Sequence, residues 1–147
     1  MVSRCSSLDD GTGRPLAGLF QPDGRGREYA GLHIFVDLWV GSQIDDPEHV
    51  MDTLHEAVKA SGAALLDSRL HRFEPHGLTV FFLLAESHLA FHSWPEQDYA
   101  SIDLFTCGQT DAGSAVKVLR ARFTPASMDV VEHKRGMRDT PAASVEG

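Results

Sequence analysis

Three strand-like segments follow one another between residues 78 and 106, with only short connections between them. Residues 78–85 are almost wholly apolar, which is typical of a strand that is buried on both faces. Residues 88–94 and 101–106 alternate between side chains of opposite character, as strands with one covered face do. Because short connections join antiparallel neighbours, these segments predict the centre of an antiparallel sheet.

Two helices and further strands are predicted around this centre. Asp46 is a suitable N-cap, Pro47 fits the first helical turn, and Gly62 is a helix stop signal. The element order is strand, helix, several strands, helix, strand, which predicts an α+β fold, a two-layer sandwich with an antiparallel β-sheet and helices packed on one face. The additional predicted elements are strands over residues 32–40, 63–73 and 128–133 and helices over residues 46–62 and 111–123.

The chain length of 147 residues suits one domain. Residues 1–28 are rich in glycine, proline and charge, and we expect a disordered N-terminal tail there. The predicted folded domain spans residues 29–133, and residues 134–147 are expected to form a flexible C-terminal tail.

Composition narrows the partners of the chain. The formal net charge of -8 argues against nucleic acid, because a phosphate-binding protein needs a basic face. No apolar run reaches the length of a membrane span, and the first residues lack the apolar core of a signal peptide. Two cysteines without a disulfide framework fit a reducing compartment, so we expect a cytoplasmic protein without membrane or nucleic-acid partners.

The window from Ala85 to Gly108 holds the residues that indicate chemistry, and it reads AESHLAFHSWPEQDYASIDLFTCG. It places a carboxylate and a hydroxyl side by side at Glu86-Ser87. Two imidazoles follow, and a thiol, Cys107, lies one hairpin away. A serine hydroxyl is a weak nucleophile that neighbouring groups must activate, so this combination indicates covalent catalysis.

Several blocks of this window occur in a fixed order: ESH, HSWPE and IDLFTCG. Together with HRF at residues 71–73 and VVEHKRG at residues 130–136, they resemble the prokaryotic S-adenosylmethionine decarboxylase proenzymes, a pyruvoyl-dependent family. The resemblance covers roughly residues 31–136 and implies the same α+β architecture. It also implies that the chain forms a homodimer of processed α/β pairs, with active sites near the subunit interface.

The resemblance implies that the chain cuts its own backbone between Glu86 and Ser87. Ser87 would become a pyruvoyl group, the cofactor that forms a Schiff base with the substrate amine and accepts electrons during decarboxylation. His92 would transfer protons during processing, and Cys107 would be the proton donor to the substrate. Thr79 falls where the family has a hydroxyl residue that helps processing.

Each of these residues also has a purely structural interpretation. A histidine such as His92 is often a hydrogen-bonded core residue, and a cysteine such as Cys107 is often a small buried apolar residue. Thr79 is β-branched, which packing in a strand alone would select. The family resemblance also implies three substrate-binding residues, which are Phe73, Trp94 and Glu96.

His88, His92 and Cys107 are the residue types that bind zinc, and they cluster in this window. Two residues four apart on a strand share a face but are separated by roughly 13 Å, at about 3.3 Å per residue. This separation exceeds what one tetrahedral ion can bridge, so no metal is predicted.

Three functions remain open from the sequence. The first is decarboxylation of S-adenosylmethionine, which supplies the aminopropyl donor for spermidine biosynthesis. The second is a pyruvoyl-dependent arginine or ornithine decarboxylase on the same fold, and the third is a catalytically silent regulatory paralogue. Phe73, Trp94 and Glu96 favour the first, because aromatic rings stack on adenine and a carboxylate accepts hydrogen bonds from ribose hydroxyls.

Overall fold

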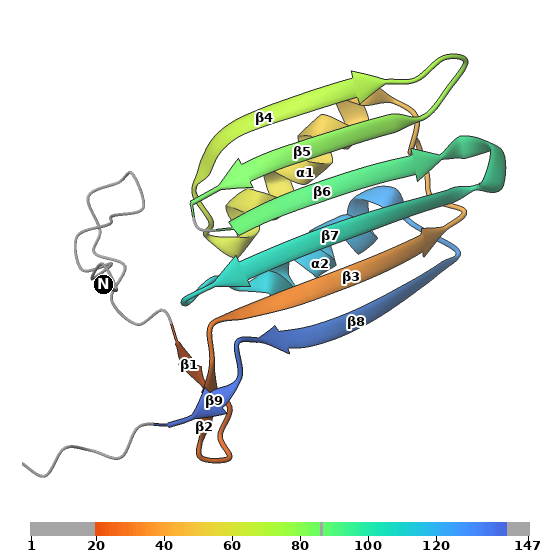
Figure 1. Cartoon of the computed structure of the whole chain (residues 1–147). Helices are drawn as coiled ribbons and strands as arrows, with labels where there is room; N and C mark the ends of the chain where they lie inside the picture. Colours follow the sequence, from red (N-terminus) through yellow and green to blue (C-terminus); the bar gives the residue numbers. More distant parts are fainter. Residues whose placement is uncertain (1–19, 86, 141–147) are drawn as a thin grey trace, which may run out of the picture.

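The computed structural model describes residues 20–85 and 87–140, and its main feature is a six-stranded sheet (Figure 1). The strand order is β4-β5-β6-β7-β3-β8, and every neighbouring pair is antiparallel. Consecutive strands β4 to β7 are neighbours in this sheet, as the short connections predicted. The strands are β3 Gly31–Trp39, β4 Leu65–Arg72, β5 Leu78–Leu84, β6 Ser87–Trp94, β7 Tyr99–Cys107 and β8 Ser127–Arg135.

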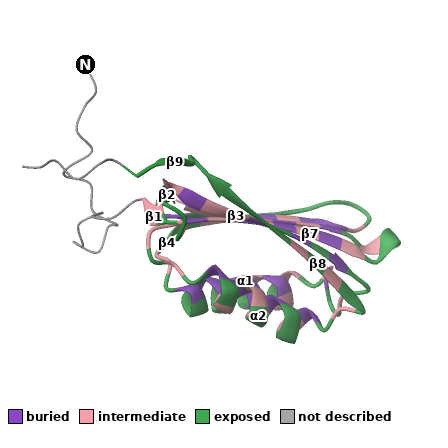
Figure 2. Cartoon of the chain, turned by 90° about the horizontal axis from the view of Figure 1, so that it is seen from below, coloured by how far each residue is buried: buried purple, intermediate pink, exposed green. Residues whose placement is uncertain are grey.

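Two helices, α1 Pro47–Ser61 and α2 Ala112–Phe123, cover one face of the sheet (Figure 2). The Asp46 carboxylate caps α1 by accepting hydrogen bonds from the backbone N–H groups of its first turn. Gly62 ends this helix in a left-handed conformation, with φ of 77°. The Asp111 carboxylate caps α2 in the same way, and its pKa is lowered by hydrogen bonds from the hydroxyl and N–H of Ser114. The predicted two-layer α+β sandwich is therefore confirmed.

The core lies between the sheet and the helices. Alternate side chains of each strand point to this side, among them the fully buried Val80, Phe82, Leu89 and Phe91. Phe91 of β6 stacks on Phe123 of α2 with 5.6 Å between the ring centroids. This packing fixes the face to which every other strand residue points.

We call the opposite side of the sheet the open face, because no helix of the described residues covers it (Figure 2). It holds the residues that alternate with the core positions, including Thr79 and His92. Large apolar side chains are also exposed here, and they are Phe35, Trp39, Phe81, Leu83, Trp94 and Val131.

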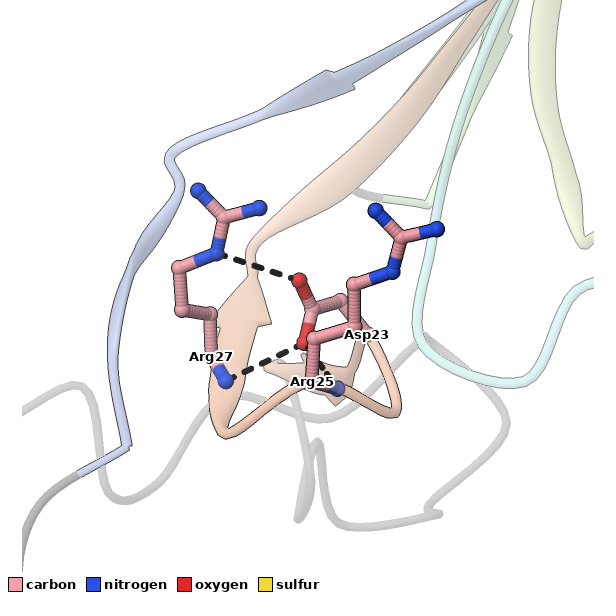
Figure 3. Close-up of polar contacts among 3 residues, drawn as sticks. All are labelled: Asp23, Arg25 and Arg27. Carbon is pink, nitrogen blue, oxygen red and sulfur yellow. Dashed lines mark hydrogen bonds and ion pairs between the residues drawn. The ribbon is translucent and has the colours of Figure 1, made fainter.

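A second, three-stranded sheet is formed by β1 Gln21–Pro22, β2 Arg27–Tyr29 and β9 Arg138–Asp139. We call it the small sheet. The Asp23 carboxylate closes its first turn by accepting hydrogen bonds from the backbone N–H groups of Arg25 and Arg27, as Figure 3 shows. These hydrogen bonds lower the pKa of Asp23, and the bond from Arg25 has the largest effect.

The small sheet corrects the predicted tails. Residues 20–28 and 134–139 contain strands, so the boundaries at 28 and 133 were placed too far inward. Polar composition indicated mobility, but Glu28 and Arg138, which are 110 positions apart, form an ion pair at 2.6 Å. Such a long-range partnership leaves no local trace in the sequence. The remaining tail residues, 1–19 and 141–147, lie outside the described residues.

Candidate functional site

The predicted site residues fall into two groups at opposite ends of the large sheet. Ser87 begins β6 and Cys107 ends β7, and we call this region the Ser87–Cys107 end. Thr79 lies near the start of β5, at the opposite end of the sheet, and it pairs with His92 of β6. We call that region the Thr79–His92 end.

Ser87 and Cys107 lie on neighbouring strands. His88 of β6 pairs with Phe105 of β7 in antiparallel orientation. Ser87 precedes His88 by one residue and Cys107 follows Phe105 by two, so both lie on the same side of this pair. The Ser87 hydroxyl donates a hydrogen bond to the Ala85 carbonyl oxygen at 3.3 Å. Glu86, the other half of the predicted cleavage site, lies outside the described residues. The two residues given the most direct chemical roles thus occupy one end of the sheet.

Cys107 also borders a cavity of about 40 Å³. The thiol is half-buried, and neighbouring residues of β3 and of the turn after β7 share the cavity. Its wall is completed from the small sheet by Gln21 and Tyr29. The sequence predicted a role for neither residue: Gln21 lies in the segment predicted to be a tail, and Tyr29 is the first residue of the predicted domain.

At the other end, the Thr79 Oγ1 and His92 Nδ1 atoms are 2.8 Å apart. The two residues are directly opposite each other on β5 and β6, so the sheet register itself brings them together. A hydroxyl bonded to one ring nitrogen fixes the orientation of the imidazole and leaves Nε2 available for proton transfer. The structure therefore joins two of the predicted processing residues.

Trp94 continues this end as part of a row of stacked rings. Its ring lies 5.2 Å from that of Tyr99, which lies 4.5 Å from that of Trp39. The Tyr99 hydroxyl donates a hydrogen bond of 2.5 Å to Asp37. Burial is the main cause that raises the pKa of Tyr99, and the Asp37 carboxylate raises it further. The hydroxyl therefore remains neutral and able to donate. The result is an exposed aromatic surface with a fixed orientation.

Phe73 and Glu96 lie in the connections at this same end. Phe73 follows β4 with its ring half exposed, and its N–H donates to the Gly77 carbonyl oxygen across the turn before β5. Glu96 lies in the short 3₁₀ turn Pro95–Gln97 that joins β6 to β7. Its carboxylate is 3.0 Å from the Nε2 atom of His76. The three predicted substrate-binding residues thus share the end that carries Thr79 and His92.

The two ends are too far apart to react with each other in one chain. Ser87 and His92 are five residues apart on β6, which corresponds to about 16 Å along an extended strand. Proton transfer requires heavy atoms within hydrogen-bond distance, directly or through a water. A single copy of the chain therefore does not assemble all four predicted catalytic groups.

The groups considered for a metal are not the ones that the fold brings together. Instead, His33, His88 and Asp103 place one ligand atom each within 4.8 Å of one another on the open face. Arg135, an obligatory donor, lies 3.3 Å from the His33 Nδ1 atom, so the ring proton is on Nε2. The Nε2 atom of His33 faces a carboxylate oxygen of Asp103 at 3.9 Å.

His33 is partly buried, as are the other two members of this cluster. Its Nε2 atom has no hydrogen-bond partner among the described residues, and burial, foremost, lowers the pKa of the imidazole. Sequence analysis missed the cluster because its members come from β3, β6 and β7. Their proximity follows from the strand order, in which β7 lies between the other two strands.

Comparisons with known proteins agree with this architecture. The family model described as S-adenosylmethionine decarboxylase matches residues 32–136. The S-adenosylmethionine decarboxylase proenzyme of Thermomicrobium roseum is 42% identical over 109 residues, which are 73% of this chain and 94% of that protein. The proenzyme of Methanococcus aeolicus is 37% identical over 112 residues, or 74% of this chain and 96% of that protein.

A solved structure is similar in three dimensions. The crystal structure of the adenosylmethionine decarboxylase from Aquifex aeolicus matches with a TM-score of 0.70 at 34% sequence identity, covering 78% of this chain and 97% of that one. Within the described part of the chain, neither helix has the length and apolar character needed to cross a bilayer. The family model and these relatives together place the chain in the S-adenosylmethionine decarboxylase family.

Proposed function

We propose that this chain is a self-processing, pyruvoyl-dependent decarboxylase that converts S-adenosylmethionine to its decarboxylated form and CO2. The product is the aminopropyl donor for spermidine biosynthesis. The observation that carries the proposal is the family match over residues 32–136, because this span contains every residue assigned to the site. The hydrogen bond between Thr79 and His92 and the adjacency of Ser87 and Cys107 give those residues fitting positions.

Processing begins with attack of the Ser87 hydroxyl on the carbonyl carbon of Glu86. The peptide C–N bond breaks as the ester C–O bond forms, and a base then removes the α-proton of residue 87. Elimination releases a chain that ends at Glu86, and the dehydroalanine left behind tautomerises and hydrolyses with loss of ammonia. His92 carries protons in these steps, while Thr79 orients its ring and helps to hold the scissile carbonyl.

The pyruvoyl group, once formed, supplies an electron sink for the charge that remains when CO2 leaves. The residues at this end fit such a group, because Ser87 begins β6 beside the end of β7, which carries the half-buried thiol of Cys107. Cys107 returns a proton to the substrate α-carbon. A thiol must be reduced to do so, and this requirement fits the reducing cytoplasm.

Substrate recognition belongs to the aromatic end. The exposed rings of Phe73 and Trp94 offer flat apolar surfaces that suit an adenine, and the Glu96 carboxylate suits ribose hydroxyls. Arginine and ornithine have no ring and no ribose for these groups to contact. The exposed rings therefore favour S-adenosylmethionine over a basic amino acid.

The active unit is a homodimer of processed α/β pairs. The open face carries exposed large apolar side chains that a partner would cover. In a two-fold dimer through this face, the Ser87–Cys107 end of one subunit can lie against the Thr79–His92 end of the other. Ser87 then meets His92 of the partner subunit, which removes the separation of about 16 Å within one chain.

Intact-mass spectrometry tests the proposal. The wild-type protein is expected to yield two chains split between Glu86 and Ser87, with the second chain lighter by one ammonia than hydrolysis predicts. Ser87→Ala is expected to remain one chain, because it lacks the attacking hydroxyl. Cleavage that survives in Ser87→Ala would disprove the assignment.

Release of CO2 decides among the three functions. Turnover with S-adenosylmethionine supports the first function, and turnover with only arginine or ornithine supports the second. A wild-type chain that neither cleaves nor turns over any of the three substrates would support the regulatory paralogue.

A further inference from the structure

The small sheet lies outside the shared family domain. Its strands β1 and β2 precede the matched residues 32–136, and β9 follows them. It forms next to the start of β3 and the end of β7 (Figure 1), which is the Ser87–Cys107 end. This chain therefore places additional residues beside its candidate proton donor.

Specific contacts hold the small sheet in this position. The Ala30 N–H donates to the Arg135 carbonyl oxygen at 2.8 Å, which connects β2 to the end of β8. The ammonium of Lys134 lies 5.1 Å from the ring centroid of Tyr29. These two contacts attach the first flanking segment to the family domain, and the ion pair between Glu28 and Arg138 joins the two chain segments that flank the domain.

The cavity beside Cys107 connects the small sheet to the site. Gln21 and Tyr29 border it on one side, and Thr106, Cys107 and Gly108 border it on the other. At about 40 Å³ it can hold only a small polar group or a water. Because Cys107 must reach the substrate α-carbon, the substrate atoms nearest this cavity are those of its α-amino acid head.

We propose that β1 and β2 form a wall of the substrate site, in which Gln21 contacts the α-amino acid head and shields Cys107 from solvent. The inference rests on the proposed function for the identity of the substrate. An amide is a neutral donor and acceptor, so Gln21 can hold this head group without adding a charge beside the thiol. Gln21 is thus a positioning residue specific to chains that carry the small sheet.

Alkylation of Cys107 tests the wall without any substrate. In a Cys5→Ser background, mass spectrometry follows the rate at which iodoacetamide modifies Cys107. We expect Gln21→Ala to react severalfold faster, because the shortened side chain opens the cavity. Arg25→Gln is the matched control, since Arg25 lies in the same hairpin but does not border the cavity, and its rate should equal that of the parent.

Steady-state turnover of S-adenosylmethionine by the processed enzyme tests the contact. Gln21→Ala is expected to raise KM about three- to tenfold with kcat and self-cleavage retained, as for loss of one hydrogen bond. Gln21→Glu should raise KM further, because its carboxylate repels that of the substrate. Thermal melting of each variant should match the parent and would show that the fold is intact.

The outcomes separate the two proposals. If the wild-type protein decarboxylates S-adenosylmethionine but Gln21→Ala keeps the parental KM and the parental alkylation rate, the proposed role of Gln21 as a wall of the site is wrong. A wild-type protein that neither cleaves nor turns over overturns the proposed function, and the alkylation rates still decide whether Gln21 covers Cys107.

Discussion

The two ends of the open face share strand β6 but differ in almost every physical respect. The Ser87–Cys107 end is enclosed, since the small sheet completes its cavity and the partly buried His33 and His88 lie nearby. The Thr79–His92 end is exposed, and its rings form an ordered stack with satisfied hydrogen bonds. In the proposed function, the first end carries the reacting groups, and the second end carries the recognition surface and the imidazole of His92. In the proposed dimer, residues of a single window of sequence therefore belong to two different active sites.

The largest effect expected from this comparison is recovery of activity by mixing two inactive chains. Ser87→Ala and His92→Ala are each expected to be inactive alone. When they are co-expressed, one site of each mixed dimer combines the intact Ser87 of one chain with His92 of the partner subunit. Random pairing makes about half of the dimers mixed, so about a quarter of wild-type CO2 release should return.

The matched control pairs two lesions at the same end. Co-expression of Ser87→Ala with Cys107→Ala leaves no mixed site intact, so activity should not exceed that of Cys107→Ala alone. Failure of the first pair to recover would show that each chain builds its own site, and the dimer proposed above would be wrong.

A smaller but still large effect is expected at Cys107. Cys107→Ala should cleave normally, because the thiol has no role in the attack of Ser87. Its rate of decarboxylation should fall about 10²- to 10⁴-fold, the usual contribution of a positioned proton donor. Intact mass and CO2 release measure the two steps separately, with Cys5→Ala as the control. Unchanged turnover would remove Cys107 from the chemistry.

Much of the fold could be predicted because its signals are local. Alternation along residues 88–94 separates Leu89 and Phe91 from His92, and the structure places the first two in the core and His92 on the opposite face. The caps at Asp46 and Asp111 act within one helical turn, so a few residues specify them. The strand order of residues 65–107 followed from short connections.

The features that could not be predicted depend on partners that are distant in sequence. The small sheet needs Glu28 and Arg138 together, and each alone is an ordinary surface charge. The His33 cluster depends on β3 lying beside β7, which no periodicity encodes. Family resemblance assigned both Ser87 and His92 to processing, and the structure places them five residues apart on β6.

At the Thr79–His92 end, a graded effect is expected from the hydroxyl of Thr79. Thr79→Val keeps the shape of the side chain but loses the hydrogen bond to the imidazole, so self-cleavage should slow about three- to tenfold. Thr79→Ser keeps a hydroxyl and should cleave at a rate close to wild type. The rates can be measured by separating the chains at timed intervals after synthesis. Equal rates in both variants would mean that the bond does not orient His92.

The smallest expected effect concerns stability at the enclosed end. Burial foremost, and Arg135, His88 and His133 in addition, lower the pKa of His33 from 6.5, while Asp103 opposes them. The unfolded chain therefore binds a proton at this residue before the native protein does, and stability falls as the pH drops below about 6.5. The His33→Asn variant lacks this contribution. Its free energy of unfolding, measured in urea, should therefore fall less than that of the wild type between pH 7.5 and pH 5.5, which are about one unit above and below 6.5. His71→Asn, an exposed histidine on β4, should follow the wild type. If His33→Asn shows the same decline as the wild type, the pH response does not arise from the enclosed end.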